Sequence, residues 1–386
     1  MTMAAAAMTT SLAQLLFLLS TLLTVTTALA TSSSSSPPVA PSSTPLRSYL
    51  ITGANKGQGL ALCRRILTEQ DDTHVFLCSR DVSRGDTAKE MLLMGECHGD
   101  NGNTSSAVID ESRVDVVQLD VTDDNSVRAA LEQVQTKLSA ASSSSDGKEK
   151  NKLAGIVSNA GILWGHPLPE LMDVCATGVK RVLDAFVPLV EDDGRVIVVT
   201  SGLGPLMHSY SGEQRQVALM NGENDDDDDH DDLAPMMKEC LTAYEQSATI
   251  EERIAAFEKI EFPGGPFAEA APDFHMYGLA KMFGDVIMLR TARKYPALRV
   301  NSVDPGLVYT DLILKMPKYA GMKKEETGAQ SPEEGVEGTM RLLFDCKEEE
   351  NVVGKGLGVG SGKLYALNKE RELVFSDIDR MPQKQG

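Results

Sequence analysis

The residues that decide the fold are T-G-A-N-K-G-Q-G at positions 52–59. Residues 48–51 before them, Ser-Tyr-Leu-Ile, favour a strand, and residues 60–67 after them have the apolar spacing of a helix. Glycine suits such a turn because the backbone takes angles that other residues avoid, and because a side chain would keep a pyrophosphate from the helix N-terminus. The order of strand, glycine turn and helix predicts a dinucleotide-binding unit. The alternative is an ordinary turn between a strand and a helix.

Apolar runs of strand length recur along the chain and alternate with helical patterns. We expect strands at residues 74–79, 114–119, 153–157, 195–200 and 299–303, with helices such as 126–138 between them. This alternation predicts an α/β fold with a doubly wound parallel sheet of the Rossmann type, which binds ligands at the carboxyl ends of its strands. We expect one domain over residues 47–386, which closes with a helix after residue 331 and a last strand near residues 360–365.

Two basic residues predict the choice of cofactor. Arg80 directly follows the second expected strand, where such a fold presents either an acid to a ribose hydroxyl or a base to a 2′-phosphate. Lys56 in the glycine turn adds a second positive charge, and a guanidinium with an ammonium suits a phosphate better than a diol. We therefore expect NADP(H). The alternative for Arg80 is a solvated surface side chain.

A tyrosine and a lysine four residues apart carry the expected chemistry. In Tyr277-Gly278-Leu279-Ala280-Lys281 the two side chains leave one face of a helix about a turn apart. A nearby ammonium should lower the pKa of the Tyr277 phenol toward the range that proton transfer needs. The alternative is a buried structural tyrosine, and likewise Ser201, after the strand at 195–200, can be a plain turn residue.

The motifs together resemble the short-chain dehydrogenases/reductases over residues 48 to about 312. They are T-G-A-N-K-G-Q-G, D-V-T-D from Asp120, S-N-A-G at 158–161, V-V-T-S-G at 198–202, Y-G-L-A-K at 277–281 and D-P-G-L-V-Y-T-D-L at 304–312. The chain is most similar to the monomeric NADPH-dependent carbonyl reductase group, because C-S-R-D-V-S-R-G at 78–85 matches its NADPH-selecting segment. The gap between Ser201 and Tyr277 is also unusually long, as in that group.

The resemblance implies a role for each matching residue. Tyr277 would protonate a carbonyl oxygen as hydride arrives from the nicotinamide, Ser201 would orient that oxygen, and Lys281 would hold the nicotinamide ribose and tune Tyr277. The implied reaction is the NADPH-dependent reduction of a small aldehyde, ketone or quinone. The implied cofactor-binding residues are Gly53, Asn55, Lys56, Gly57, Gly59, Arg80, Asp120, Val121, Asn159, Tyr277, Lys281, Pro305, Gly306, Val308 and Thr310.

One position departs from the family pattern. Three residues before Gly178 the family usually has an asparagine that supports a proton path to the lysine, and this chain has Cys175. A thiol is a weak hydrogen-bond partner, so the relay is expected to be rerouted or slow. The departure leaves open a second function, a non-catalytic NADP-binding sensor or scaffold of the same fold. A third is an alcohol or steroid oxidoreductase that works in the oxidising direction.

The long gap before Tyr277 is expected to form an insertion at residues 205–272. Within it, residues 233–259 have apolar side chains at helical intervals, and by the resemblance such helices cover the surface where relatives oligomerise, so we expect a monomer. Residues 222–232 include a run of acidic side chains that repel one another and predict a disordered loop. A metal site is the alternative for this run, but nothing fixes the carboxylates, and we expect no metal.

The net charge and the amino-terminal sequence limit the partners and the cell compartment that we expect. The net charge of −19 argues against nucleic acid or an anionic membrane as the main partner. Residues 12–30 are apolar and end in Ala-Leu-Ala, which indicates a cleavable signal peptide over residues 1–30, although an uncleaved anchor is the alternative. A Ser/Pro-rich linker follows at residues 31–46. We expect entry into the secretory pathway, with the ER lumen, secretion or onward routing to an organelle as destinations.

The cysteines show no metal or redox spacing. We expect Cys63 and Cys78 to be small apolar core residues. The six cysteines are Cys63, Cys78, Cys97, Cys175, Cys240 and Cys346.

Overall fold

The computed structural model describes residues 46–95, 109–141, 152–221, 233–345, 361–367 and 373–376. The expected signal peptide, the linker before residue 46 and the acidic run at 222–232 lie outside these residues. Among the described residues, no helix combines the length and apolarity needed to cross a membrane.

A single sheet forms the centre of the molecule, with strands in the order β3-β2-β1-β4-β5-β6-β7-β8. All neighbouring pairs from β3 to β7 are parallel, and β7 pairs with β8 antiparallel. The doubly wound α/β fold is therefore confirmed, with an additional antiparallel edge strand that the sequence analysis did not predict. The strands are β1 (Arg47–Ile51), β2 (Thr73–Ser79), β3 (Val114–Gln118), β4 (Leu153–Ser158), β5 (Val190–Val199), β6 (Arg299–Asp304), β7 (Lys363–Leu367) and β8 (Leu373–Ser376).

Helices cover both faces of the sheet, which is why β2 and β4 are buried along their whole length. In β1, Tyr49 and Ile51 belong to a core that includes residues of α2, α3 and α16, and Leu50 belongs to a core that includes residues of α4, α6 and α12. The two faces thus alternate along the strand. The helices before the insertion are α2 (Gly57–Glu69), α3 (Val82–Leu93), α4 (Asp124–Ala141), α5 (Leu168–Met172) and α6 (Gly178–Phe186), and α7 (Leu203–Tyr210) leads into it.

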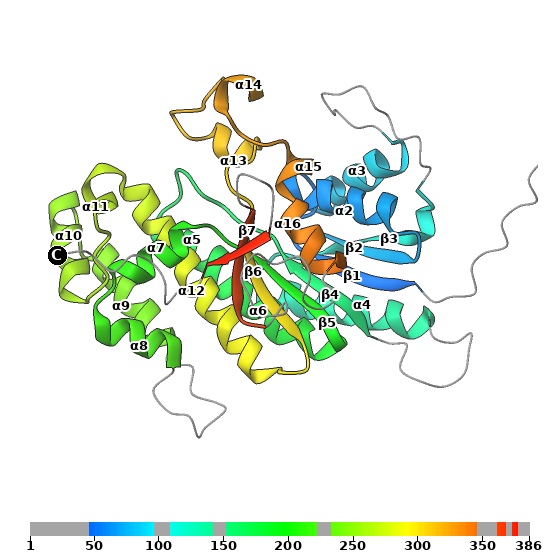
Figure 1. Ribbon diagram of the computed structural model, residues 1–386, viewed down its shortest axis with the longest axis horizontal. Coiled ribbons are helices and arrows are strands. Elements are labelled where there is room, and N and C mark those ends of the chain that lie inside the picture. Colours follow the sequence, from blue (N-terminus) through cyan, green and yellow to red (C-terminus); the bar gives the residue numbers. More distant parts are fainter. Residues whose placement is uncertain are drawn as a thin grey trace, which may run out of the picture. The chain divides into compact units, whose positions relative to one another are not determined.

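The insertion is helical, as expected, and gathers at one end of the sheet, away from β1 to β3 (Figure 1). Residues 233–259 form two helices, because Thr249 begins a new helix with a capping box whose second partner is Glu252. The long α12 that follows begins at Pro272 and carries both Tyr277 and Lys281, as the spacing of these two residues predicted. The remaining helices are α8 (Glu213–Asn221), α9 (Leu233–Glu245), α10 (Ile250–Lys259), α11 (Phe267–Ala270), α12 (Pro272–Lys294), α13 (Asp311–Leu314), α14 (Lys324–Thr327), α15 (Pro332–Gly335) and α16 (Glu337–Met340).

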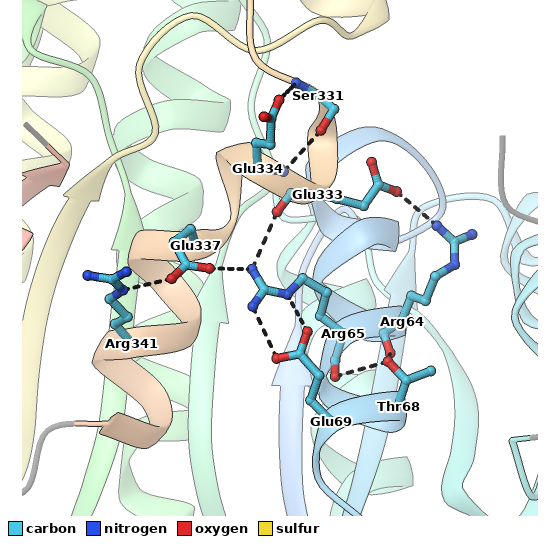
Figure 2. Close-up of polar contacts among 9 residues, drawn as sticks. All are labelled: Arg64, Arg65, Thr68, Glu69, Ser331, Glu333, Glu334, Glu337 and Arg341. Atoms are coloured by element: carbon cyan, nitrogen blue, oxygen red, sulfur yellow. Dashed lines mark hydrogen bonds and ion pairs between the residues drawn. The ribbon is translucent and has the colours of Figure 1, made fainter. Parts of the chain in front are cut away.

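A network of charged side chains ties α2, the helix after the glycine turn, to α15 and α16 near the end of the chain (Figure 2). The Arg65 guanidinium donates to both carboxylate oxygens of Glu69, at 2.6 and 3.0 Å, and to Glu337 at 2.8 Å. Glu337 also accepts from Arg341 at 2.7 Å, and Arg64 donates to Glu333 at 3.0 Å. The network therefore holds the helix of the glycine turn against a part of the chain about 270 residues away.

We expect Glu337→Gln to lower the free energy of unfolding by about 1 kcal/mol at neutral pH, because it weakens two charge-assisted hydrogen bonds at a mostly buried site. Burial alone would raise the pKa of Glu337, but hydrogen bonds and charges from Arg65 and Arg341 hold it below its ordinary value of 4.5. A carboxyl group whose pKa is depressed in the folded state stabilises the fold above its unfolded pKa and loses this contribution as the pH falls. The difference between parent and variant, measured by urea denaturation, should therefore shrink below about pH 4.5.

Glu69→Gln is the matched control for this network. The side chain of Glu69 is 44% exposed, against 21% for Glu337, so water replaces its lost bonds more easily. Equal losses in the two variants would show that the buried part of the network adds no stability of its own.

Candidate active site

The glycine turn forms a cradle that side chains would fill. Gly53 and Gly57 have positive φ angles of 62° and 55°, which favour glycine. A Cβ on Gly59 would lie 2.5 Å from the Gly53 carbonyl oxygen and 2.7 Å from Asn159 Nδ2. Asn55 lies half-buried in the same turn, which directly precedes α2. The turn thus fits a dinucleotide whose pyrophosphate approaches the backbone at a helix N-terminus.

The S-N-A-G segment after β4 is fixed directly to this turn. The buried Thr52 hydroxyl accepts from the backbone N–H groups of Asn159 and Ala160, each at 2.9 Å. Asn159 Nδ2 in turn donates to the carbonyl oxygens of Thr52 at 2.9 Å and Gly53 at 3.3 Å. Asn159 lies in the cradle, as expected. The part played by Thr52 was missed, although it is the first residue of the glycine motif.

Arg80 and Asp120 meet beside the ends of β2 and β3. Arg80 Nε lies 3.9 Å from Asp120 Oδ2, and the Arg80 side chain is 73% exposed. The other Asp120 oxygen accepts from the backbone N–H of Thr122 at 3.0 Å and from its hydroxyl at 2.7 Å. Val121 between them is buried and packs against Gly178. Arg80 and Asp120 thus lie side by side just after β2 and β3, at the strand ends where the sequence placed them. The Arg80 guanidinium is open to solvent.

Lys56 has a partner that was not expected. Its Nζ lies 2.7 Å from Asp311 Oδ2, and both side chains are well exposed. Next to it, a Cβ on Gly57 would lie 3.3 Å from the Thr310 methyl group. The segment after β6 therefore touches the glycine turn, which brings two expected parts of the cofactor site together.

The segment from Pro305 to Thr310 is held by a glutamine that the sequence analysis missed. Gln330 donates from its side chain to the Pro305 carbonyl oxygen at 3.0 Å, and its own carbonyl accepts from the Tyr309 N–H at 2.8 Å. Gly306 has a φ of 72°, and its N–H donates to Asp304 Oδ1 at 2.9 Å. Val308 is buried in this segment. No motif points to Gln330, because it lies outside the matched stretch and acts through tertiary contacts.

Tyr277 and Lys281 lie one turn apart on α12, and both are buried. Lys281 Nζ is 5.7 Å from the centre of the Tyr277 ring and donates to the Val199 carbonyl oxygen at 2.8 Å. A Cβ on Gly161, in the S-N-A-G segment, would lie 3.9 Å from the same Nζ. The structure therefore brings this pair next to the end of β5 and the cofactor cradle.

The expected lowering of the Tyr277 pKa is wrong for this structure. Burial raises the pKa of the phenol well above its ordinary value of 10.0, and Cys175, Asp304 and Asp285 raise it further through their charges. The Lys281 ammonium faces the ring and is committed to the Val199 carbonyl, so it does not offset the loss of solvent. The phenol is thus held in its protonated form.

Ser201 begins a tight turn that packs on α12. Its Oγ accepts from the Leu203 N–H at 3.3 Å, and the next residue, Gly202, donates from its N–H to Asp304 Oδ2 at 3.0 Å. A Cβ on Gly204 would lie 3.2 Å from the Lys281 carbonyl carbon, and one on Gly278 would lie 3.2 Å from the Leu203 carbonyl oxygen. These close approaches place the Ser201 turn directly on the part of α12 that carries Tyr277 and Lys281.

Cys175 is 1% exposed and lies in a π-helical turn, Asp173–Thr177, between α5 and α6. Its Sγ donates to the Ile162 carbonyl oxygen at 3.6 Å, and a Cβ on Gly284 would lie 2.6 Å from the Cys175 carbonyl oxygen. Cys175 therefore packs between the S-N-A-G segment and α12, as a core residue would. Cys63, Cys78 and Cys240 are also buried and free, which confirms the core role expected of Cys63 and Cys78.

The insertion joins α12 through a buried histidine two residues before Tyr277. The His275 ring lies 5.1 Å from the Phe257 ring, and its Nε2 lies 3.3 Å from the Phe262 carbonyl oxygen. Burial lowers the pKa of His275 to about 4, so the imidazole is neutral at physiological pH. The insertion thus packs directly against the first turns of the helix that carries Tyr277.

Comparisons with known proteins agree with this geometry. The family model described as short chain dehydrogenase matches residues 47–213. Over these residues the chain belongs to the short-chain dehydrogenases/reductases. Similar proteins include (+)-neomenthol dehydrogenase of Arabidopsis thaliana, which is 27% identical over an alignment of 310 residues that covers 74% of this chain and 90% of the relative.

A carbonyl reductase of Sus scrofa, whose name specifies NADPH, is also 27% identical over 310 residues, 75% of this chain and 86% of the relative. The solved structure of salutaridine reductase from Papaver somniferum has the same fold, with a TM-score of 0.54 and 22% identity over 77% of this chain and 95% of that chain. The family that the sequence motifs predicted is therefore confirmed. The insertion lies mostly beyond the matched family model, which ends at residue 213.

Proposed function

We propose that this chain reduces a small aldehyde, ketone or quinone to the alcohol with NADPH. As a short-chain dehydrogenase/reductase it is an oxidoreductase acting on carbonyl or CH–OH groups. The observation that carries the finer proposal is the packing of the Ser201 turn on the turn of α12 that bears Tyr277 and Lys281, beside a glycine cradle. A proton donor, a hydroxyl and a dinucleotide site in one place are what carbonyl reduction requires.

Each side chain has a task in this reaction. NADPH supplies the hydride when it is bound. Tyr277 donates its phenolic proton to the carbonyl oxygen, and the Ser201 hydroxyl hydrogen-bonds that oxygen and orients it. Because burial raises the pKa of Tyr277, its phenol carries the proton at neutral pH before the carbonyl compound is reduced. Lys281, whose Nζ lies beside the S-N-A-G segment, would hold the nicotinamide ribose when NADPH is bound.

The choice of NADPH over NADH rests on Arg80 and Lys56. Arg80 presents an exposed guanidinium after β2, where the 2′-phosphate of NADPH would lie. Lys56 lies in the glycine turn with its ammonium paired to an exposed carboxylate that a phosphate can displace. Arg80→Ser should therefore raise KM for NADPH far more than KM for NADH.

The experiment that tests the proposal measures NADPH oxidation by the full chain with a panel of aldehydes, ketones and quinones. We expect turnover with at least one class of carbonyl compound and a preference for NADPH over NADH. NADPH binding without turnover across the whole panel would favour the sensor alternative. Absence of both binding and turnover would overturn the proposal.

We expect Asp311→Asn to lower the Kd for NADPH by about threefold, because the carboxylate competes with the cofactor phosphate for Lys56. Titration of the cofactor by fluorescence measures the effect. Lys56→Met is the opposite control and should raise the Kd. An unchanged Kd in Asp311→Asn would mean that the ion pair does not oppose cofactor binding.

A further inference from the structure

A buried carboxyl group, Asp285, lies on the same face of α12 as the proposed catalytic pair. Tyr277, Lys281 and Asp285 follow one another at intervals of four residues, so their side chains lie along one side of the helix. Asp285 is 4% exposed. Nothing in the proposed reaction yet uses it, and a buried carboxyl group is costly unless it is well hydrogen-bonded.

Asp285 joins the ends of two neighbouring strands. Thr200, which precedes Ser201, donates its hydroxyl proton to Asp285 Oδ2 at 2.9 Å, and Ser302 of β6 donates to Oδ1 at 2.9 Å. One turn earlier in α12, Lys281 donates to the carbonyl oxygen of Val199. Successive turns of α12 thus hold successive residues at the end of β5, immediately before Ser201.

The close packing around Asp285 leaves little freedom for another arrangement. A Cβ on Gly204, in the turn that follows Ser201, would lie 2.4 Å from Asp285 Oδ2. Beside the carboxyl group is a cavity of about 10 Å³, which Met282 and Leu289 also line. Its small size and mostly apolar lining keep bulk water from the carboxyl group.

The surroundings of Asp285 bring the pKa of its carboxyl group close to neutral pH. Burial raises its pKa to about 7, against the hydrogen bonds from Thr200 and Ser302. Two charged groups near it change its pKa: Lys281 on the same helix lowers the pKa of Asp285, and Asp304 at the end of β6 raises it. The other titratable groups that face Asp285 are Tyr277 and, across the cavity, His208 of α7. In turn, the negative charge of Asp285 raises the pKa of Tyr277.

We propose that Asp285 is a positioning residue for carbonyl reduction: its carboxyl group accepts from Thr200 and Ser302 and so fixes the Ser201 turn against α12. The proposal rests on the proposed function. An amide at this position retains the shape and one acceptor oxygen but removes the charge, so the effect of the hydrogen bonds can be measured apart from that of the charge.

The experiment compares Asp285→Asn with the parent chain and with Asp285→Val, using the pH dependence of kcat/KM for carbonyl reduction at saturating NADPH. In Asp285→Asn we expect kcat near neutral pH to stay within about threefold of the parent. The alkaline fall in kcat/KM should move to lower pH by about one unit, because removal of a nearby negative charge favours the phenolate. In Asp285→Val we expect kcat to fall by at least about tenfold with KM little changed, because Thr200 and Ser302 lose their acceptor.

A second readout needs no activity. A carboxyl group whose folded pKa is raised stabilises the fold below its unfolded pKa, and this contribution is lost as the pH rises through the folded pKa. The Tm of the parent relative to Asp285→Asn should therefore fall between about pH 4 and about pH 7. Asp71→Asn, which alters an exposed side chain in the turn between α2 and β2, is the matched control and should change neither the pH dependence of the Tm nor the pH profile of kcat/KM.

The outcomes separate this inference from the proposed function. With an active parent, undiminished kcat in a folded Asp285→Val would overturn the positioning, and an unchanged pH profile in Asp285→Asn would count against an ionised carboxyl group on the face of α12 that carries Tyr277. A Tm difference that does not change with pH would also count against a carboxyl group that ionises near neutrality. An inactive parent that binds NADPH would instead overturn the proposed function, and the inference with it.

Discussion

Tyr277→Phe will lower kcat/KM for carbonyl reduction by about a thousandfold or more, because it removes the group that donates the proton. The substitution removes one hydroxyl group and leaves the aromatic ring in place. The contact between Lys281 Nζ and the ring, 5.7 Å from Nζ to the ring centre, is therefore kept. The fold and the Kd for NADPH should therefore change little. Steady-state NADPH oxidation and cofactor titration on the same preparation measure the two quantities.

The control for this prediction is Tyr244→Phe. Tyr244 lies in α9 of the insertion, with the Arg253 guanidinium 4.4 Å from its ring centre. Tyr244→Phe therefore removes the same phenolic hydroxyl group from a tyrosine that is not on α12. Its kcat/KM should match that of the parent. Retention of more than about a tenth of parental turnover in Tyr277→Phe would mean that another group donates the proton.

Gly59→Ala will weaken NADPH binding by about a hundredfold or more, because its new methyl group has no room. The Cβ would lie 2.5 Å from the Gly53 carbonyl oxygen and 2.8 Å from Ala54 Cα, so the backbone of the turn itself must shift. A shift of this kind displaces the N–H groups that meet the pyrophosphate, and misplacement by about 1 Å can cost about a hundredfold. Calorimetric titration with NADPH measures the loss.

Gly95→Ala controls for the general effect of replacing glycine. A Cβ there would meet nothing within 4 Å, although its φ of 66° makes the change mildly unfavourable. We expect a small loss of stability and an unchanged Kd for NADPH. If Gly59→Ala bound NADPH as tightly as Gly95→Ala does, the glycine turn would not be the pyrophosphate site.

The sequence predicted the conformation of the glycine turn because the requirements of that turn are local. Gly53 and Gly57 adopt angles that favour glycine, and Asn159 follows a strand that lies beside β1, so the motif and the strand order together placed them. The antiparallel β8 was missed, since residues 373–376 form a short edge strand without a motif or a clear alternation. The split of residues 233–259 into two helices was also missed, although Thr249 and Glu252 form a capping box that can be recognised in the sequence.

The electrostatics of the site could not be predicted in the same way. The spacing of Tyr277 and Lys281 predicted a lowered phenol pKa, yet burial raises it, and burial depends on packing from distant segments. The same holds for the partner of Lys56. Asp311 lies 255 residues further along the chain, and only the folded chain brings its carboxylate to 2.7 Å.

The sequence by itself determined the doubly wound fold and the glycine turn, and it supplied the residues proposed for the reaction, because each depends on backbone angles and spacings within one short segment. Tertiary structure alone decided that Lys281 holds the end of β5, that Asp285 joins β5 to β6, and that Gln330 fixes the segment after β6. These contacts depend on desolvation and on distances between segments far apart in the chain, which no local pattern encodes.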